Sequence, residues 1–386
     1  MSSIRKDINI GIIDQAGSQS GSWLYSYNLF YSIRKCGVKC FLFSIINNPP
    51  YCMPTFLPIK FIGIKLFDKL FYFVKGYIKS YKIAKKHKIN WMILQIYSFS
   101  FIDLFAFLLF FLFNIYTIAI VHDVEPFESE KGKSKLIRFI ILNYFAKLII
   151  VHNDYSYSCI IKYIKKRKRK YIKIIKHGAF TEEEYLKEIY HDKEKIVPEC
   201  VGLKDIILFF GQIKYEKGLD LFLSALRYIK YDNFIVIAGR IRDKKINYKD
   251  IVIKEKLEKK VIIIDRYISE AEKNYLFNIA KVIVLPYRRV FQSGVLLLAM
   301  SKRKVIIASD LEPFKEIIKD KYNGFLFKAG SIYDLQDKIN FVLSCDENFL
   351  EQIRNNAYIF VKNNYSWEEI ANQYCGIINE FQNKNL

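Results

Sequence analysis

The chain has 386 residues, of which 52% are hydrophobic, and it carries 61 Lys and Arg against 39 Asp and Glu. This length suffices for two domains of ordinary size, and the hydrophobic share excludes a disordered or fibrous chain. The net charge of +22 calls for a partner or another purpose, and the candidate partners are a nucleic acid, an anionic membrane and a phosphorylated substrate. No RNA- or DNA-binding module is recognisable, so we expect no nucleic-acid partner. The seven cysteines lack metal or redox spacing, which is typical of a reducing cytoplasm.

The first predicted element is a strand over residues 8–13, "INIGIID". Because it begins within ten residues of Met1, we expect no signal peptide. The Gly/Ser-rich loop "DQAGSQSGS" follows, then a helix over residues 23–35, and then a second strand in "CGVKCFLFSII". This order predicts a strand–helix–strand unit with a polar loop at its first turn.

The run from Ile96 to Val121 is almost entirely apolar and, taken whole, is long enough to cross a bilayer. Asp103 and Asn114 interrupt it, since a carboxylate is costly in a membrane and Asn is a turn former. We therefore predict a strand over 91–97, a helix over 101–113 and a strand over 115–121. The last strand ends on His122 and Asp123, at the edge where open α/β sheets place ligands.

Basic and aromatic residues are concentrated in the first half, over residues 60–88 and in the run "KKRKRK" at 165–170. The pattern predicts a helix near 133–145, a strand in "KLIIVHN", and a basic helix through "CIIKYIKKRKRKYIKIIKHG" that leads to a short strand ending at His177–Gly178. Such a charged helix face is either simply solvated or in contact with an anionic membrane. The second interpretation predicts peripheral attachment to the inner face of the cell membrane.

A second α/β series follows the acidic stretch "TEEEYLKEIYHDKEKIVPEC", which has the composition of a linker. Strands are predicted in "DIILFFGQI", "NFIVIAGR", "KVIIIDRYI", "KVIVLPY" and "KVIIASD", with helices between them, one of them opened by the cap Ser269. Strands that alternate with helices in both halves predict an α/β protein with two doubly wound, Rossmann-like domains.

The second half contains two predicted helix starts that suit an anion. In "FFGQIKYEKGLD" a strand ends at Gly211, and Lys217 precedes the next helix; in "LPYRRVFQSGVLLLA" Ser293 and Gly294 open a helix after a basic turn. Free backbone amides at helix starts bind phosphate groups, and neighbouring cations strengthen these contacts. The two motifs together therefore predict a diphosphate site.

The motifs "FFGQIKYEKGLDLFLSAL", "DRYISEAEKNYLFNIAKVIVLPY", "QSGVLLLAMSKRKVIIASDLEPFKEII" and "NGFLF" resemble the retaining, GT-B fold glycosyltransferases of family 4, also called group 1. The end of the chain, "YSWEEIANQYCGII", resembles the helix by which these enzymes return to their first domain. "VHDVEPF" and "IKHGAF" fit the first domain more loosely.

The resemblance implies an acceptor-binding domain at 1–195, a nucleotide-sugar-binding domain at 196–365, and a C-terminal helix at 366–386 that packs back on the first domain. The two domains would face each other across a cleft. The expected reaction moves a sugar from a UDP- or GDP-sugar to a glycan or lipid-linked acceptor, as in the synthesis of capsule, lipopolysaccharide O-antigen or exopolysaccharide. No other cofactor and no metal are expected.

The resemblance also implies roles for individual residues. Lys217 would bind the donor diphosphate as a catalytic cation, with further contacts from Lys214, Gly211, Gln212, Ser293, Gly294 and Arg288. Tyr267 and Ile268 would flank the base, and Gln292 is assigned to the ribose. His122 would be catalytic and would approach the donor sugar, with Gly21 and Glu316 nearby.

One departure from the family pattern leaves the function open. The usual pair of glutamates would fall on Val290 and Leu298, and neither is acidic. An alternative is therefore a degenerate, non-catalytic relative that binds a membrane or a partner enzyme. His122 has a second interpretation too, as a histidine that caps its strand and bonds a neighbouring backbone group.

Overall fold

The computed structural model describes residues 8–15, 21–45, 51–56, 66–125, 132–180, 196–243 and 245–384. The chain folds into two compact units. Unit 1 comprises Met1–Gly178 together with Trp367–Leu386, and unit 2 comprises Ala179–Ser366. The domain boundaries predicted from the sequence fall at 195/196 and 365/366, whereas the structure divides the chain at 178/179 and 366/367.

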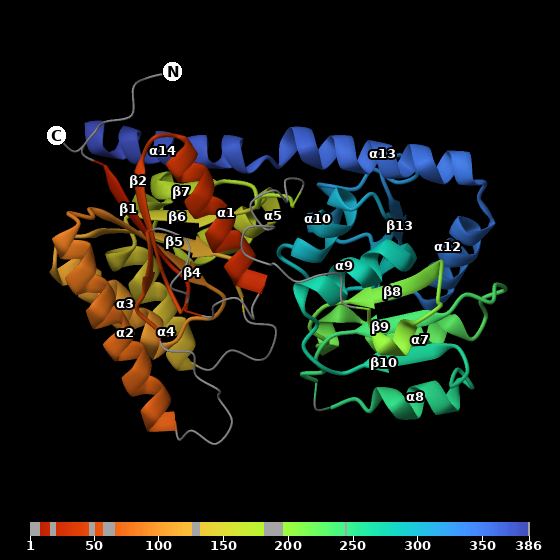
Figure 1. Cartoon of the computed structure of the whole chain (residues 1–386). Coiled ribbons are helices and arrows are strands. Elements are labelled where there is room, and N and C mark those ends of the chain that lie inside the picture. Colours follow the sequence, from red (N-terminus) through yellow and green to blue (C-terminus); the bar gives the residue numbers. More distant parts are fainter. Residues whose placement is uncertain are drawn as a thin grey trace. The chain divides into compact units, whose positions relative to one another are not determined.

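Unit 1 is built on a seven-stranded parallel sheet with the order β3-β2-β1-β4-β5-β6-β7 (Figure 1). Its strands are β1 (Asn9–Ile13), β2 (Lys39–Ser44), β3 (Cys52–Pro54), β4 (Trp91–Ile96), β5 (Tyr116–Val121), β6 (Leu148–Val151) and β7 (Ile172–Ile174). The chain runs outward from β1 to β3 and then returns to add β4 on the other side of β1. This reversal is a topological switch point, where ligands bind in open α/β sheets.

The helices of unit 1 form two groups. The helices are α1 (Gly21–Lys35), α2 (Leu66–Lys86), α3 (Phe101–Leu112), α4 (Gly132–Ile140), α5 (Asp154–Ile160) and α14 (Trp367–Lys384). α1 packs against α14, while α3 packs against both α2 and α4 (Figure 1). The final helix of the chain is thus part of the same compact unit as the first.

The apolar run of the sequence folds as β4–α3–β5, as predicted. Ser100 and Asp103 form a capping box at the start of α3, and Asn114 adopts the left-handed conformation, with φ 56°, in the turn that follows. Among the described residues, no helix combines the length and the hydropathy needed to cross a membrane.

The prediction of a basic helix before β7 was wrong. α5 ends at Ile160, and the basic run lies in a 3-10 turn, Lys166–Tyr171. The side chain of Asn143 explains the break, because its amide donates to the carbonyl of Tyr163 at 3.0 Å and its oxygen accepts from the backbone nitrogen of Lys165 at 2.8 Å. Tertiary hydrogen bonds here override helix propensity. The helix predicted near 133–145 consists of α4 and a π-helical turn, Ile141–Phe145.

Unit 2 is built on a six-stranded parallel sheet with the order β10-β9-β8-β11-β12-β13. Its strands are β8 (Ile206–Phe210), β9 (Ile235–Ala238), β10 (Val261–Ile264), β11 (Ala280–Leu285), β12 (Val305–Ser309) and β13 (Phe325–Phe327). Its helices are α7 (Leu219–Leu226), α8 (Tyr248–Lys254), α9 (Glu270–Ile279), α10 (Gly294–Ser301), α11 (Glu312–Lys315), α12 (Ile332–Ser344) and α13 (Glu347–Asn364). Strand order reverses between β8 and β11, which makes this pair the switch point of unit 2.

Both faces of the sheet in unit 2 are buried. In β8, Ile206 and Leu208 belong to one apolar cluster, whereas Ile207 and Phe209 belong to a second cluster on the other face. Because successive side chains of a strand point to opposite faces, this strand must be apolar throughout. The burial of both faces of this sheet therefore confirms the predicted doubly wound α/β class for unit 2.

Candidate functional site

Two loops meet at the switch point of unit 2, and both lead into a helix. After β8 the chain passes Gly211, forms a 3-10 turn over Tyr215–Lys217, and enters α7 through Gly218. After the neighbouring strand β11, it passes Pro286 and enters α10 at Gly294. The carboxyl ends of adjacent parallel strands lie at one edge of a sheet, so the two helix starts are neighbours.

Gly218 fixes the distance between these loops. It adopts the left-handed conformation, with φ 66°, which only glycine adopts at no steric cost. A Cβ atom at this position would lie 1.9 Å from the carbonyl oxygen of Pro286, so no larger residue fits. The backbone nitrogen of Arg288 also donates to the carbonyl of Glu216 at 2.8 Å. The loop after β8 is therefore pressed against the loop after β11.

Arg288 reinforces this contact through its side chain. Its two terminal nitrogens donate to both carboxylate oxygens of Asp220, at 2.7 and 2.6 Å, and one of them also donates to the carbonyl of Tyr215 at 3.0 Å. Such a bidentate pair holds the guanidinium in a fixed plane. The observed partners of Arg288 are thus protein groups, and its contact with a diphosphate stays a prediction.

Lys217 lies beside these fixed loops. Its ammonium group is 3.7 Å from the ring centroid of Tyr287, a buried residue, and a cation over an aromatic face is attracted to it. Lys214 occupies the cap position of the same 3-10 turn and is half-buried, whereas Gln212 is exposed. Two of the predicted cations therefore lie on one short turn.

The start of α10 has open space beside its backbone and a side-chain donor without a partner. The side chain of Ser293 caps the helix by accepting from the backbone nitrogen of Leu296 at 3.3 Å. A Cβ atom at Gly294 would meet no atom within 4 Å. The side-chain nitrogen of Gln292 is buried and has no hydrogen-bond partner, which is uncommon for a buried donor. The helix start thus offers hydrogen-bond donors beside open space.

The remaining predicted residues of unit 2 follow other strands of the same sheet. Tyr267 and Ile268 come after β10, with Tyr267 43% exposed and Ile268 buried. Ser269 begins α9 with a capping box, as predicted. Glu316 is an exposed residue at the end of α11, the helix that follows β12. These positions are all at the carboxyl side of the sheet.

Val290 and Leu298 occupy the positions of the missing glutamates. Both are buried, and both belong to the apolar cluster that packs on one face of the sheet in unit 2. Hydrophobic packing thus replaces the acidic pair, and neither residue offers a polar group to a ligand.

In unit 1, His122 lies at the carboxyl end of β5 and is only 5% exposed. Its Nε2 atom is 3.0 Å from Oε1 of Gln95, and its Nδ1 atom is 3.2 Å from Nε2 of His152. Gly21, the other residue predicted here, is the first residue of α1.

Sequence reasoning missed that three histidines gather in this region. His122, His152 and His177 surround the ring of Tyr25, with ring centroids at 5.1, 5.6 and 4.9 Å from it. A signal was present, because the histidines of "IVH", "IVH" and "IKH" come one, one and three residues after the ends of three adjacent strands, β5, β6 and β7. In the described part of the chain, no cluster of three or more His, Cys, Asp or Glu is suited to hold a metal ion.

Burial keeps these rings uncharged. It lowers the pKa of His122 well below its ordinary value, and the nearby His152 and His177 lower it further. The pKa of His152 falls to about 4 and that of His177 to about 3, both mainly by desolvation.

The fold places the protein in a structural class. Two doubly wound parallel sheets, each with its switch point, match solved structures of the GT-B architecture. Sucrose-phosphate synthase from Thermosynechococcus elongatus aligns over 98% of this chain and 100% of its own, with a TM-score of 0.75 and 14% identity. Anabaena HepE in complex with UDP-glucose aligns over 97% and 100%, with a TM-score of 0.68 and 16% identity.

The sequence comparison concerns mainly the second unit. Residues 192–360 match the family model of glycosyl transferases group 1. An uncharacterized glycosyltransferase of Methanocaldococcus jannaschii is 29% identical over 182 residues, which is 46% of this chain and 46% of the relative. The match thus spans about half the length of this relative.

Proposed function

We propose that the protein is a retaining glycosyltransferase that moves a sugar from a nucleotide-diphosphate donor to a glycan or lipid-linked acceptor in the synthesis of a bacterial cell-surface glycan. The observation that carries this proposal is the pair of helix starts at the switch point of unit 2, joined by Gly218 against Pro286 and by Arg288 against Asp220. This arrangement suits an anion, and it lies in the segment that matches the model of the glycosyl transferases group 1.

The chemistry of the site is electrostatic. As the bond between the sugar and the diphosphate breaks, negative charge develops on the leaving phosphate. The ammonium groups of Lys217 and Lys214 and the amides at Ser293 and Gly294 stabilise that charge, and groups already held in place lose no energy to reorganisation. The buried side-chain nitrogen of Gln292 supplies a donor for the ribose. The acceptor oxygen bonds to the anomeric carbon as its proton passes to the departing phosphate oxygen on the same face, so the step demands no protein nucleophile.

The comparisons support a nucleotide sugar as the donor. HepE, which shares the fold, binds UDP-glucose, and the sequence relatives are glycosyltransferases. The alternative is a non-catalytic relative, which the loss of the glutamate pair at Val290 and Leu298 favours. The intact cations and open helix start favour an enzyme.

The test is binding and slow hydrolysis across a panel of UDP- and GDP-sugars, measured by calorimetry and by nucleotide release. We expect one donor to bind and Lys217→Ala to weaken its binding at least tenfold. The matched control is Lys249→Ala, an exposed lysine of α8, which leaves binding unchanged. If no nucleotide sugar binds the wild type, the enzyme proposal fails and the non-catalytic alternative stands.

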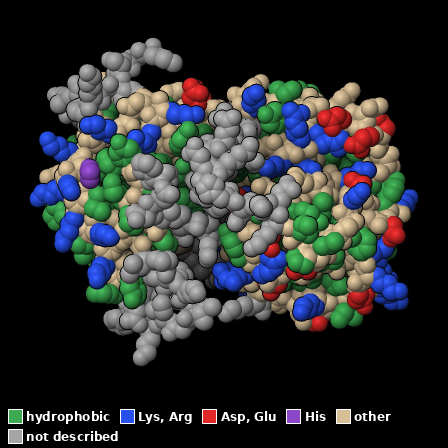
Figure 2. Space-filling model, viewed as in Figure 1, with side chains coloured by type: hydrophobic (Ala, Val, Ile, Leu, Met, Phe, Trp, Pro, Cys, Tyr) green, Lys and Arg blue, Asp and Glu red, His purple; other side chains and the backbone are tan. Residues whose placement is uncertain are grey.

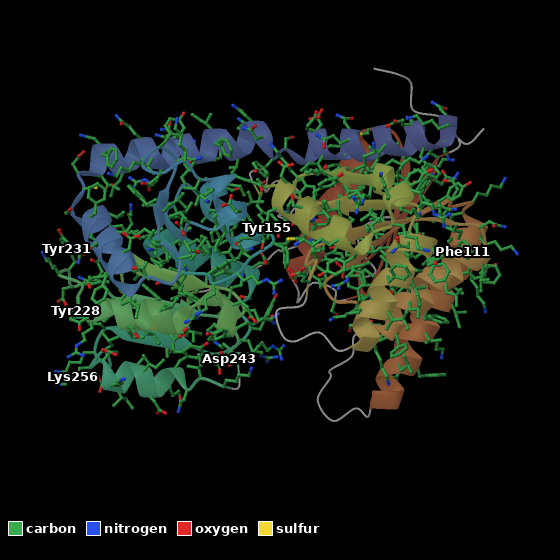
Figure 3. The ribbon with its side chains drawn as sticks, turned by 180° about the vertical axis from the view of Figure 1, so that it is seen from behind. Phe111, Tyr155, Tyr228, Tyr231, Asp243 and Lys256 are labelled. Atoms are coloured by element: carbon green, nitrogen blue, oxygen red, sulfur yellow. The ribbon has the colours of Figure 1, made fainter. Side chains whose placement is uncertain are left out.

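We further propose that unit 1 contacts an anionic membrane, and thereby the lipid-linked acceptor, at the cytoplasmic face. The supporting observation is the outer surface of α3 and α4. Large apolar side chains are exposed there, namely Phe101, Leu108, Phe111, Leu112, Leu136 and Phe139. Phe111 lies on the outer side of this helical layer (Figure 3).

Cations lie beside these apolar side chains. Lys133 and Lys135 are exposed on α4, and the ammonium group of Lys165 lies 5.3 Å from the ring centroid of Phe139. Between residues 104 and 122 the chain has no acidic residue. On the face shown in Figure 2, unit 1 presents mainly Lys and Arg beside hydrophobic side chains, while unit 2 mixes both signs. Apolar side chains with cations beside them suit a surface of anionic lipid headgroups.

A further inference from the structure

The 3-10 turn Tyr215–Lys217, which ends at the lysine predicted to bind the diphosphate, is held by three contacts with Arg288. The backbone nitrogen of Arg288 donates to the carbonyl of Glu216 at 2.8 Å. Its Nη1 atom donates to the carbonyl of Tyr215 at 3.0 Å, and its Cζ atom lies 4.3 Å from the ring centroid of the same tyrosine. One residue of the loop after β11 therefore fixes most of this turn.

Asp220 binds the same guanidinium group. Its Oδ1 and Oδ2 atoms accept from Nη1 and Nη2 of Arg288 at 2.7 and 2.6 Å, and the two side chains are only 22% and 23% exposed. Together with the bond to Tyr215, three of the five N–H groups of the guanidinium donate to the protein. A phosphate would have to compete with a carboxylate that already holds the guanidinium in a bidentate pair.

The place of Asp220 in the fold explains why it needs a partner. It lies in the first turn of α7, the helix that the chain enters through Gly218. A carboxylate at a helix start is attracted by the helix dipole, but its charge opposes the binding of a second anion there. The guanidinium of Arg288 neutralises that charge. The pair therefore makes an acidic residue compatible with a diphosphate at this helix start.

We propose that Asp220 is a positioning residue of the donor site, and that Arg288 acts through Asp220 instead of binding the phosphates itself. The pair holds the turn that carries Lys217 against the loop after β11, so that the ammonium group of Lys217 is already in place when the diphosphate binds. This inference rests on the proposed function and deepens it. It separates the residues that touch the diphosphate from the pair that holds them.

The charge of Asp220 gives the proposal a distinctive sign. If Arg288 bound the phosphates, removal of the carboxylate would release its N–H groups and also remove a negative charge, so anion binding would tighten. If the pair positions the turn, the same removal loosens Lys217. Anion binding then weakens even though the site has become more positive.

The measurement is the Kd of UDP and of GDP for the full chain, by calorimetry. For the nucleotide that binds the wild type, we expect Asp220→Ala and Arg288→Ala each to weaken binding at least fivefold. The double variant should be at most twofold weaker than the weaker single variant, because either substitution breaks the same pair. Arg288→Lys keeps the charge but cannot form two parallel hydrogen bonds, so it too should lose at least fivefold.

The matched control is Arg227→Ala at the other end of α7. Arg227 is the C-cap residue of this helix, its side chain is 58% exposed, and it lies 3.6 Å from a carboxylate oxygen of Glu255. The substitution removes the same charge from the same helix and should leave the Kd within twofold. A large loss in this control would mean that the net charge of unit 2, and not the pair, determines nucleotide affinity.

Lys217→Ala in the Asp220→Ala background measures the positioning itself. If the pair holds Lys217 in place, the factor by which Lys217→Ala weakens binding should be at least threefold smaller in this background than in the wild type. A role in stability alone would leave that factor unchanged in the folded protein. Urea unfolding of each variant shows that it is folded under the conditions of the assay.

Three results would overturn the inference. They are unchanged or tighter binding by Asp220→Ala, near-normal binding by Arg288→Lys, and an equal effect of Lys217→Ala in both backgrounds. The first two would identify Arg288 as a phosphate ligand. In all three cases Lys217→Ala still weakens binding by the wild type, so the proposed function stands. If neither nucleotide binds the wild type, the proposed function fails and this inference fails with it.

Discussion

At the switch point of unit 2, Gly218 is tightly packed and Gly294 lies beside open space. We therefore expect alanine at Gly218 to affect folding and alanine at Gly294 to affect ligand binding. At Gly218 the positive φ and the contact with Pro286 leave no room for a Cβ atom, whereas at Gly294 that atom would meet nothing. We expect Gly218→Ala to destabilise unit 2 by more than about 1 kcal/mol, since an unsuitable left-handed residue alone costs that much. Urea unfolding measures this loss.

Gly294→Ala should behave differently. The open space at Gly294 is where the diphosphate would approach the backbone, so the added methyl group should leave stability unchanged but weaken nucleotide binding at least tenfold. Gly376→Ala in α14, where a Cβ atom also meets nothing, is the control for a harmless substitution. Normal nucleotide affinity in Gly294→Ala would show that the phosphates bind elsewhere.

The buried histidines of unit 1 make its stability depend on pH. The folded-state pKa of His152 is lowered to about 4 by burial, below the ordinary value near 6.5. The unfolded chain therefore binds a proton that the folded chain excludes, and the free energy of unfolding falls as pH drops from about 6.5 to 4. For His152 this difference amounts to about 3 kcal/mol.

Urea unfolding at pH 7.5 and pH 4.5 measures this effect. We expect His152→Gln to lose less stability than the wild type between the two values, because the amide has no proton to gain. His87→Gln, which replaces a histidine outside the cluster, should follow the wild type. Parallel losses in all three proteins would contradict a titrating His152.

At the scale of elements, the packing of α14 in unit 1 depends on its first residue, Trp367. Trp367 is 7% exposed; its ring is so close to Gly178 that a Cβ atom there would lie 2.1 Å away, and it meets the ring of Tyr25 at 5.1 Å. Two helical turns further along α14, the hydroxyl of Tyr374 shares a 2.9 Å hydrogen bond with the hydroxyl of Tyr25. We expect Trp367→Ala to cost about 3–5 kcal/mol of unit 1 stability. The exposed Gln373→Ala on the same helix should change it by less than about 0.5 kcal/mol, as measured by urea unfolding.

Elements whose signal is local were predictable, and those set by tertiary contacts were not. The β4–α3–β5 unit was predicted because Asp103 and Asn114 punctuate an apolar run, and both act as a cap or a turn in the structure. The basic run at 165–170 has good helix formers, but Asn143, more than twenty residues earlier, ends the helix. No local pattern contains that information.

The same distinction holds for the sites. Lys217 and Ser293 were predicted as site residues because each lies where a strand is followed by a turn and a helix start in the sequence. The pairing of Arg288 with Asp220 and the stacking of Tyr97 on His122 join residues 68 and 25 positions apart. The histidine cluster was partly predictable. The sequence shows a histidine after each of three strands, but only the strand order of the sheet brings the three rings together.

At the scale of the whole molecule, the net charge of +22 and the apolar surface of α3 and α4 predict how the protein meets a membrane. We expect it to co-sediment with vesicles that contain phosphatidylglycerol at low salt, and to bind phosphatidylcholine vesicles weakly. Each cation near an anionic surface contributes about 1 kcal/mol, and this contribution is screened within ~10 Å at 0.1 M salt. Binding should therefore weaken steeply as salt is raised.

The apolar part of the contact is tested by substitution. Leu112 and Leu136 are 63% and 60% exposed, so Leu112→Ser with Leu136→Ser should leave stability intact. Burial of a leucine side chain contributes about 1.5–3 kcal/mol, and the double variant should lose at least tenfold in vesicle affinity at every salt concentration. Tyr228→Ser, an exposed aromatic position of unit 2 labelled in Figure 3, is the control. Equal vesicle binding by all three proteins would mean that charge alone attracts the protein, and that the surface of α3 and α4 stays outside the lipid.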